Sequence, residues 1–138
     1  MKSVCTILFM SVIAFSCSPK LAPDSTWAEG KWLLIELKEV PVQISDNNRR
    51  NANIEFTPSQ KTYSGFGGCN RISGTYNIDK SKINFTYAPL VSSDDCADLS
   101  FERTFLALLG DVDRYEVDGN IMTLKDGKNA ILRFQRKQ

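Results

Sequence analysis

The feature that most constrains the fold is a glycine-rich bend between two runs of strand-forming residues. Three of the four residues from 65 to 68 are glycine, and Cys69 and Asn70 follow them. Glycine tolerates the left-handed backbone that a tight bend between strands needs. The flanking segments 61–66 and 72–78 are rich in residues that favour strands. The bend therefore predicts two neighbouring strands.

Most of the remaining chain also shows the period-two spacing of strands. Leu33, Ile35 and Leu37 are expected to share one face of a first strand. Other strands are expected at 54–56, 83–87, 114–117, 121–124 and 130–135, with hairpin turns at 118–120 and 126–127. Residues 98–110 instead show helical spacing, with Glu102 in the first turn and Phe101, Phe105 and Leu109 facing the sheet.

These elements predict a mainly β fold, with one helix inserted before the last three strands. The expected architecture is a small antiparallel, incompletely closed β-barrel with one α-helix packed across it. Such a barrel can hold a small apolar ligand, so some of its aromatic side chains are candidates for lining a cavity.

The N-terminus has the pattern of a bacterial export signal. Lys2 precedes an apolar run from Val4 to Phe15, which is too short to span a bilayer. Residues 14–17 read Ala-Phe-Ser-Cys, a relaxed lipobox in which Cys17 becomes the lipidated first residue. The same residues also fit an ordinary signal peptidase site. We expect residues 1–16 to be a signal peptide and residues 17–29 to be a lipidated start and flexible tether.

Charge argues against two classes of partner. Cleavage would remove Lys2 and leave 17 − 1 = 16 basic and 16 acidic side chains. A neutral chain offers no electrostatic basis for binding nucleic acid or anionic headgroups. The expected attachment to a membrane is therefore the lipid on Cys17.

The residue inventory also limits the available chemistry. The chain has no histidine, which excludes Ser-His-Asp catalysis and the usual histidine-bearing metal sites. The glycine-rich bend lacks the Gly-Lys-Ser/Thr ending of a phosphate loop and precedes a strand. We expect no cofactor and no metal. Two less favoured alternatives, a calcium site and a carboxylate pair for glycoside cleavage, rest on the acidic residues Asp94, Asp95, Asp98 and Glu102.

Several motifs together resemble one family. Gly65-x-x-Gly68-Cys69-Asn70-x-x-x-Gly74-x-Tyr76, followed by Cys96, Glu102, Phe105 and Leu109, resembles the signature of the META domain, or HslJ-like, family of envelope proteins. The resemblance extends over nearly all of the mature chain and implies a META-like domain at residues 30–138. It implies a compact, incompletely closed barrel with a packed helix, and no established chemistry. Glu102 is expected to be structural, bonding the glycine bend or the region of Asn70.

The resemblance also brings together Cys69 and Cys96. In an exported protein they are expected to form a structural disulfide, with a redox switch or a reactive thiol as the alternative. Cys17 would then be an odd thiol, and lipidation removes it.

The predicted function is that of a non-enzymatic, lipid-anchored protein of the bacterial envelope. It would act by binding a partner protein or by supporting the envelope under stress. The protein is expected to be monomeric and to face the periplasm or sit on the outer membrane. The alternative function is a carrier or chaperone for a small apolar ligand or lipid tail in the barrel interior. An enzyme of unfamiliar type that uses Asp or Glu is the third hypothesis.

Overall fold

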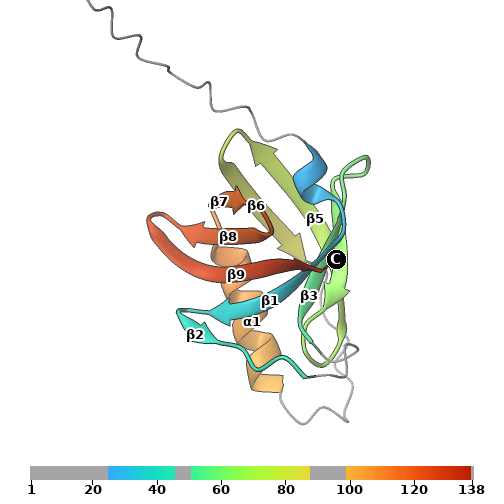
Figure 1. The fold of residues 1–138 in the computed structure, drawn as a ribbon. Helices are drawn as coiled ribbons and strands as arrows, with labels where there is room; N and C mark the ends of the chain where they lie inside the picture. The colour runs from blue at the N-terminus through green and yellow to red at the C-terminus, as the bar shows by residue number, and fades with distance from the viewer. Residues whose placement is uncertain (1–24, 46–50, 88–98, 138) are drawn as a thin grey trace, which may run out of the picture.

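The computed structural model describes residues 25–45, 51–87 and 99–137. Within these residues the chain forms one 3-10 helix, nine strands and one α-helix (Figure 1). The elements are η1 (Ser25–Ala28), β1 (Lys31–Leu37), β2 (Val40–Pro41), β3 (Asn53–Thr57), β4 (Thr62–Phe66), β5 (Arg71–Asp79), β6 (Lys82–Tyr87), α1 (Leu99–Asp111), β7 (Arg114–Asp118), β8 (Ile121–Asp126) and β9 (Asn129–Lys137).

The strands form one antiparallel sheet that closes on itself. The order is β2-β1-β3-β4-β5-β6-β7-β8-β9, and β1 also pairs with β9. Figure 1 shows β9 lying beside β1, although the two strands are close to opposite ends of the chain. Strand pairing around the ring is shortest between β6 and β7, where the register contains a single pair, Lys82 with Arg114. The predicted mainly β, antiparallel fold with one helix is confirmed.

Strand β1 changes its inward face part-way along its length. Trp32 and Leu34 are buried, whereas Leu33 and Ile35 are only half-buried. In the pairing with β9, Leu34 is opposite Phe134 and Glu36 is opposite Arg133, so Ile35 is the extra residue of a β-bulge. Leu37 then turns back to the core. Leu33 is opposite the exposed Gln135, whereas Leu37 is opposite the buried Leu132. The expectation that Leu33, Ile35 and Leu37 share one face is therefore wrong, because the bulge places Leu33 and Leu37 on opposite faces.

The interior of the ring is filled by large side chains. Aromatic rings make edge-to-face and tilted contacts across it, such as Phe56 with Tyr76 at 5.0 Å and Tyr63 with Phe85 at 5.5 Å between centroids. Helix α1 contributes Phe105 and Leu109, which are fully buried. The largest fully buried side chains are those of Trp32, Tyr63, Phe105, Phe134, Leu34, Ile54, Ile83, Leu109, Met122, Leu124, Leu132 and Glu102. The aromatic residues of the strands are therefore mostly packing residues.

The folded domain begins earlier than residue 30. Helix η1 buries Trp27, whose ring packs on Phe56 and Tyr115 at centroid distances of 5.1 and 5.0 Å. The Trp27 carbonyl accepts hydrogen bonds from Trp32 Nε1 at 3.1 Å and from Arg136 Nη2 at 3.2 Å. The expected tether at 17–29 therefore overlaps the fold at residues 25–28.

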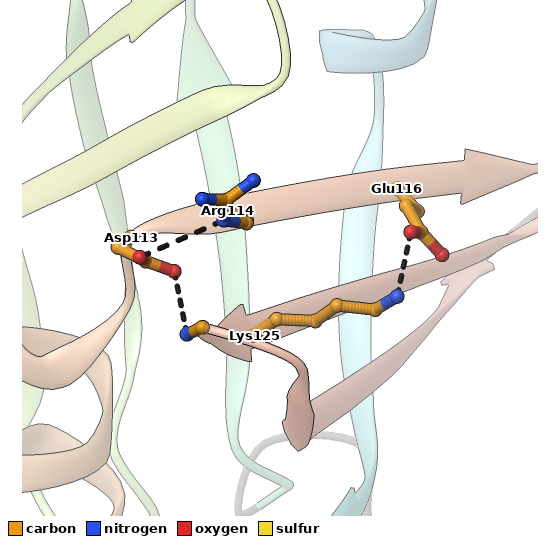
Figure 2. Close-up of polar contacts among 5 residues, drawn as sticks. Asp113, Arg114, Glu116 and Lys125 are labelled. Atoms are coloured by element: carbon orange, nitrogen blue, oxygen red, sulfur yellow. Dashed lines mark hydrogen bonds and ion pairs between the residues drawn. The ribbon is translucent and has the colours of Figure 1, made fainter.

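Polar contacts order the start of β7 and the β8–β9 turn. Figure 2 shows Lys125 reaching Glu116, with Nζ and Oε1 2.6 Å apart. Asp113 lies 3.7 Å from the Arg114 guanidinium and accepts a hydrogen bond from the backbone N–H of Gly127 at 2.9 Å. Asp113, Arg114 and Glu116 are about half exposed or more, so these ion pairs contribute little stability.

Candidate functional site

The glycine-rich bend is a four-residue loop, residues 67–70, that is bonded to the first turn of α1. The Glu102 side chain is 1% exposed and accepts three hydrogen bonds from this loop. Oε2 accepts from the backbone N–H of Cys69 at 3.0 Å and of Asn70 at 2.5 Å, and Oε1 accepts from Asn70 Nδ2 at 2.7 Å. Buried N–H donors thereby stabilise a carboxyl group that has left water. Glu102 bonds the loop as expected.

Gly67 and Gly68 have no side chains, and this leaves room for Glu102 and Phe101 of α1. A Cβ on Gly67 would lie 2.6 Å from Glu102 Oε2, and a Cβ on Gly68 would lie 2.9 Å from the Phe101 ring. Gly68 also has a φ of 112°, which residues with a side chain rarely adopt. The loop also closes on itself, because Gly67 N–H donates to the Asn70 carbonyl at 2.8 Å. Its glycines therefore serve close packing against α1.

The other motif residues shape the sheet. A Cβ on Gly65 would lie 2.0 Å from the Asn53 carbonyl oxygen, so β3 and β4 approach too closely for a side chain. Gly74 pairs with Tyr63 across β4 and β5, and the Tyr63 ring covers the space beside it. Tyr76 is buried against Phe56. These residues are packing positions, and the geometry gives them no catalytic role.

Several predicted residues fall outside the described part of the chain. They are Cys17, Asp94, Asp95, Cys96 and Asp98. Cys69 is described, but its disulfide with Cys96 stays a prediction, as does lipidation of Cys17. Within residues 25–45, 51–87 and 99–137, no group of three His, Cys, Asp or Glu side chains is placed to hold a metal ion. In the same ranges no helix is long and apolar enough to cross a membrane.

An apolar groove lies between the β1–β2 hairpin and the start of α1. It has a volume of about 620 Å³ and continues along residues 42–44. Its described lining residues are Leu34, Leu37, Lys38, Val40, Pro41, Val42, Gln43, Ile44, Asn51, Ala52, Gly68 and Phe101. Val40 is 64% exposed and Ile44 is 47% exposed, so two large apolar side chains lie at the surface beside the same groove. Lys38 carries the one charge among these lining residues.

Hydrogen bonds hold the rim of this groove. Asn51 Oδ1 accepts from the Ser45 N–H at 3.0 Å, and Asn51 Nδ2 donates to the Ser45 carbonyl at 2.8 Å. At the hairpin tip, Lys38 and Glu39 both have positive φ, as a two-residue turn of the I′ type requires. The groove was not predicted from the sequence, because its lining combines the segment around Val40 and Ile44 with Gly68 and Phe101, which are distant in the chain. The alternation of Val40, Val42 and Ile44 around Pro41 was the available signal.

The buried tyrosines have altered acidity. Burial raises the pKa of Tyr63 to about 12 from its ordinary value of 10.0, and the nearby Tyr87 adds to the rise. Burial also raises the pKa of Tyr76 and Tyr115. The hydroxyl groups of Tyr63 and Tyr115 are buried and have no hydrogen-bond partner in the part of the chain that the structure describes. These phenols are therefore poor proton donors or nucleophiles at neutral pH.

The fold is that of a small, mainly β domain, with a closed ring of strands, one covering helix and a glycine loop bonded to the Glu102 carboxylate. Among the described residues no catalytic group is assembled. A family model for the META domain matches residues 25–138, and the chain belongs to the META domain family. The matched range starts at η1, in agreement with the burial of Trp27. No curated protein matches the chain.

Solved structures share the fold. A DUF4847 family protein from Bacteroides vulgatus has a TM-score of 0.61 at 18% identity, covering 80% of this chain and 94% of that one. A protein from Burkholderia xenovorans, solved by NMR, has a TM-score of 0.64 at 22% identity, covering 92% of this chain and 99% of that one. At such low identity these similarities support the fold alone.

Proposed function

We propose that the protein is a non-enzymatic, lipid-anchored binding module of the bacterial cell envelope that holds an apolar segment of a partner protein in the groove between the β1–β2 hairpin and α1. The single observation that carries the proposal is the groove itself, which is apolar, open and bordered by the exposed Val40 and Ile44. The META domain is not a known enzyme family. Family membership and the absence of histidine from the sequence favour binding over catalysis.

The groove favours a partner with a particular chemistry. Its apolar lining favours aliphatic or aromatic side chains, which would gain free energy by leaving water. Lys38 at the hairpin favours an acidic residue beside that apolar segment. The filled ring interior argues against the alternative of a ligand inside the ring. A small apolar ligand or lipid tail would instead have to use the same groove.

The position of η1 suggests how the groove would lie relative to a lipid anchor on Cys17. In Figure 1 the helix η1 lies at the upper end of the molecule, and the β1–β2 hairpin lies towards the lower end. A lipid on Cys17 would therefore leave the groove on the side away from η1, where it is open to a partner. This orientation depends on the proposed anchor.

Site-specific photo-crosslinking tests the groove. A photoreactive residue at Val40 is expected to give a discrete protein adduct in cells, whereas one at Lys128, in the β8–β9 turn, is not. Ile44→Asp is expected to abolish the Val40 adduct, because a carboxylate in the groove opposes apolar binding. Equal adducts at both positions, or an adduct that survives Ile44→Asp, would contradict the proposal.

Two further measurements separate the parts of the proposal. Metabolic labelling with a palmitate analogue is expected to mark the wild type and Cys5→Ser but not Cys17→Ser, and a soluble protein with unmodified Cys17 would contradict the anchor. Native mass spectrometry after gentle extraction addresses the alternative. A small apolar molecule that co-purifies with the wild type, and is lost in Ile44→Asp, would assign the groove to a ligand instead of a protein.

A further inference from the structure

The outward face of β3, β4, β5 and β6 carries eight hydroxyl and amide side chains, bordered by the charged residues Glu55, Arg71, Asp79 and Lys82. One row runs across the four strands in register: Thr57 is opposite Thr62, Thr62 is opposite Thr75, and Thr75 is opposite Thr86. The neighbouring rows hold Ser64 opposite Ser73, and Asn77 opposite Asn84. The inward face of the same strands holds the buried core. We name these eight residues the hydroxyl–amide field.

A hollow of about 340 Å³ opens at one border of this field. It is lined by Lys31, Asn53, Glu55, Ser64, Gly65, Arg71, Ile72 and Ser73. Gly65 lies on its floor, where β3 and β4 approach too closely for a side chain. Ser64 and Ser73 belong to both the hollow and the hydroxyl–amide field, so one ligand can contact both.

The hollow carries a small excess of positive charge. Lys31 and Arg71 stand against the single carboxylate of Glu55, and within the described residues none of the three takes part in an ion pair. Lys31 is directly opposite Lys137 in the pairing of β1 with β9 and directly opposite Glu55 in the pairing of β1 with β3. The Glu55 carboxylate offsets one of the positive charges of Lys31, Lys137 and Arg71, so an anion at Lys31 and Arg71 would still meet a net positive surface.

The chemistry of the two regions fits one class of ligand. Each hydroxyl or amide side chain can both donate and accept a hydrogen bond, so it matches a ligand whose groups do the same. Neighbouring strands lie about 4.8 Å apart, which repeats these groups regularly along each row. Sugar hydroxyls have this dual character, and Arg71 can bind a carboxylate through two parallel N–H groups.

We propose that the outward face of β3–β6 binds an acidic glycan chain, with ring hydroxyls on the hydroxyl–amide field and a sugar carboxylate at Lys31 and Arg71. This site is separate from the apolar groove and does not depend on the proposed function. A glycan on the sheet face and a protein segment in the groove would contact different lining residues.

Calorimetric titration of the folded protein tests this site with three probes: a hexamer of galacturonic acid, the neutral hexamer of glucose, and a hexamer of glutamic acid. The galacturonate hexamer is expected to bind with a Kd below about 1 mM, more tightly than the neutral hexamer. The glutamate hexamer has carboxylates without sugar hydroxyls and is expected not to bind. No binding of either sugar, or equal binding of the glutamate and galacturonate hexamers, would overturn the proposal.

Variants locate the binding. Arg71→Gln is expected to weaken galacturonate binding about tenfold, and the double variant Thr62→Val/Thr75→Val several-fold, because each removes polar contacts. Thr123→Val on β8 and Lys128→Gln are the matched controls and should bind as the wild type does. Ile44→Asp should also leave glycan binding unchanged, which separates this site from the groove. Equal affinity of Arg71→Gln and the wild type would overturn the assignment to this face.

Discussion

Glu102 of helix α1 binds Asn70 of the glycine loop through both carboxyl oxygens, with Oε2 accepting from the backbone N–H at 2.5 Å and Oε1 accepting from Nδ2 at 2.7 Å. The two residues are 32 positions apart in the sequence. This contact fixes the start of the helix against the bend between β4 and β5. It gives the most distinctive motif of the chain a structural role.

Replacing Glu102 by Gln should destabilise the fold by roughly 1–3 kcal/mol. The amide of Gln places an N–H group among N–H donors, and a buried polar group is left without its hydrogen bonds. Urea denaturation followed by circular dichroism measures the change. Glu116→Gln is the matched control, because that side chain is 67% exposed, and it should change stability by less than about 0.5 kcal/mol. A change at Glu102 no larger than the control would contradict the structural role of the contact.

Gly67→Ala should destabilise the protein by about 2 kcal/mol, because the new methyl group displaces the Glu102 carboxyl from its donors. Gly119→Ala is the comparison: it has open space but a φ of 57°, so it should cost about 1 kcal/mol through backbone strain alone. In a Glu102→Ala background the loss of stability caused by Gly67→Ala should nearly vanish, whereas the loss caused by Gly119→Ala should persist. A double-mutant cycle measures both, and additive effects at Gly67 and Glu102 would refute the steric coupling.

The stability of the protein should fall as pH rises from 10 towards 12. Burial raises the pKa of Tyr63 to about 12, so the folded protein keeps the phenol proton in a range where the unfolded chain, with a pKa near 10.0, releases it. The contribution is fully present below pH 10 and is lost as pH rises to the folded value. Tyr63→Phe should reduce this alkaline loss, as followed by thermal denaturation at a series of pH values.

The same variant should be as stable as the wild type at pH 7, or more stable by roughly 1 kcal/mol, because it removes a buried hydroxyl that bonds to none of the described residues. An unchanged alkaline curve, together with a large loss of stability at pH 7, would show that the Tyr63 hydroxyl is bonded in solution.

The predicted disulfide between Cys69 and Cys96 should appear as a linked peptide pair in non-reducing mass spectrometry of the exported protein. Its removal in Cys69→Ser/Cys96→Ser should cost about 3–4 kcal/mol, because the bond restricts the unfolded chain over a loop of this length. Detection of both cysteines as free thiols in the exported protein would refute the pairing and favour the redox or reactive-thiol alternative.

Much of the local structure follows from the sequence alone. Period-two spacing locates β3 to β9, and the helical spacing after residue 98 gives α1 within one residue at each end. Turn glycines mark two hairpins, where Gly119 and Gly127 adopt positive φ. These features are predictable because they depend on interactions between residues close in the chain.

Only the tertiary structure decides which of these residues face the core and which contact one another. The bulge at Ile35 reverses the inward face of β1, and it exists because β1 must pair with β9 nearly one hundred residues later. The burial of Trp27, the contact of Glu102 with the glycine loop, and the apolar groove beside Val40 also require the closed ring. Local spacing determines the elements of this protein, whereas register and closure, which depend on distant pairings, determine its surfaces.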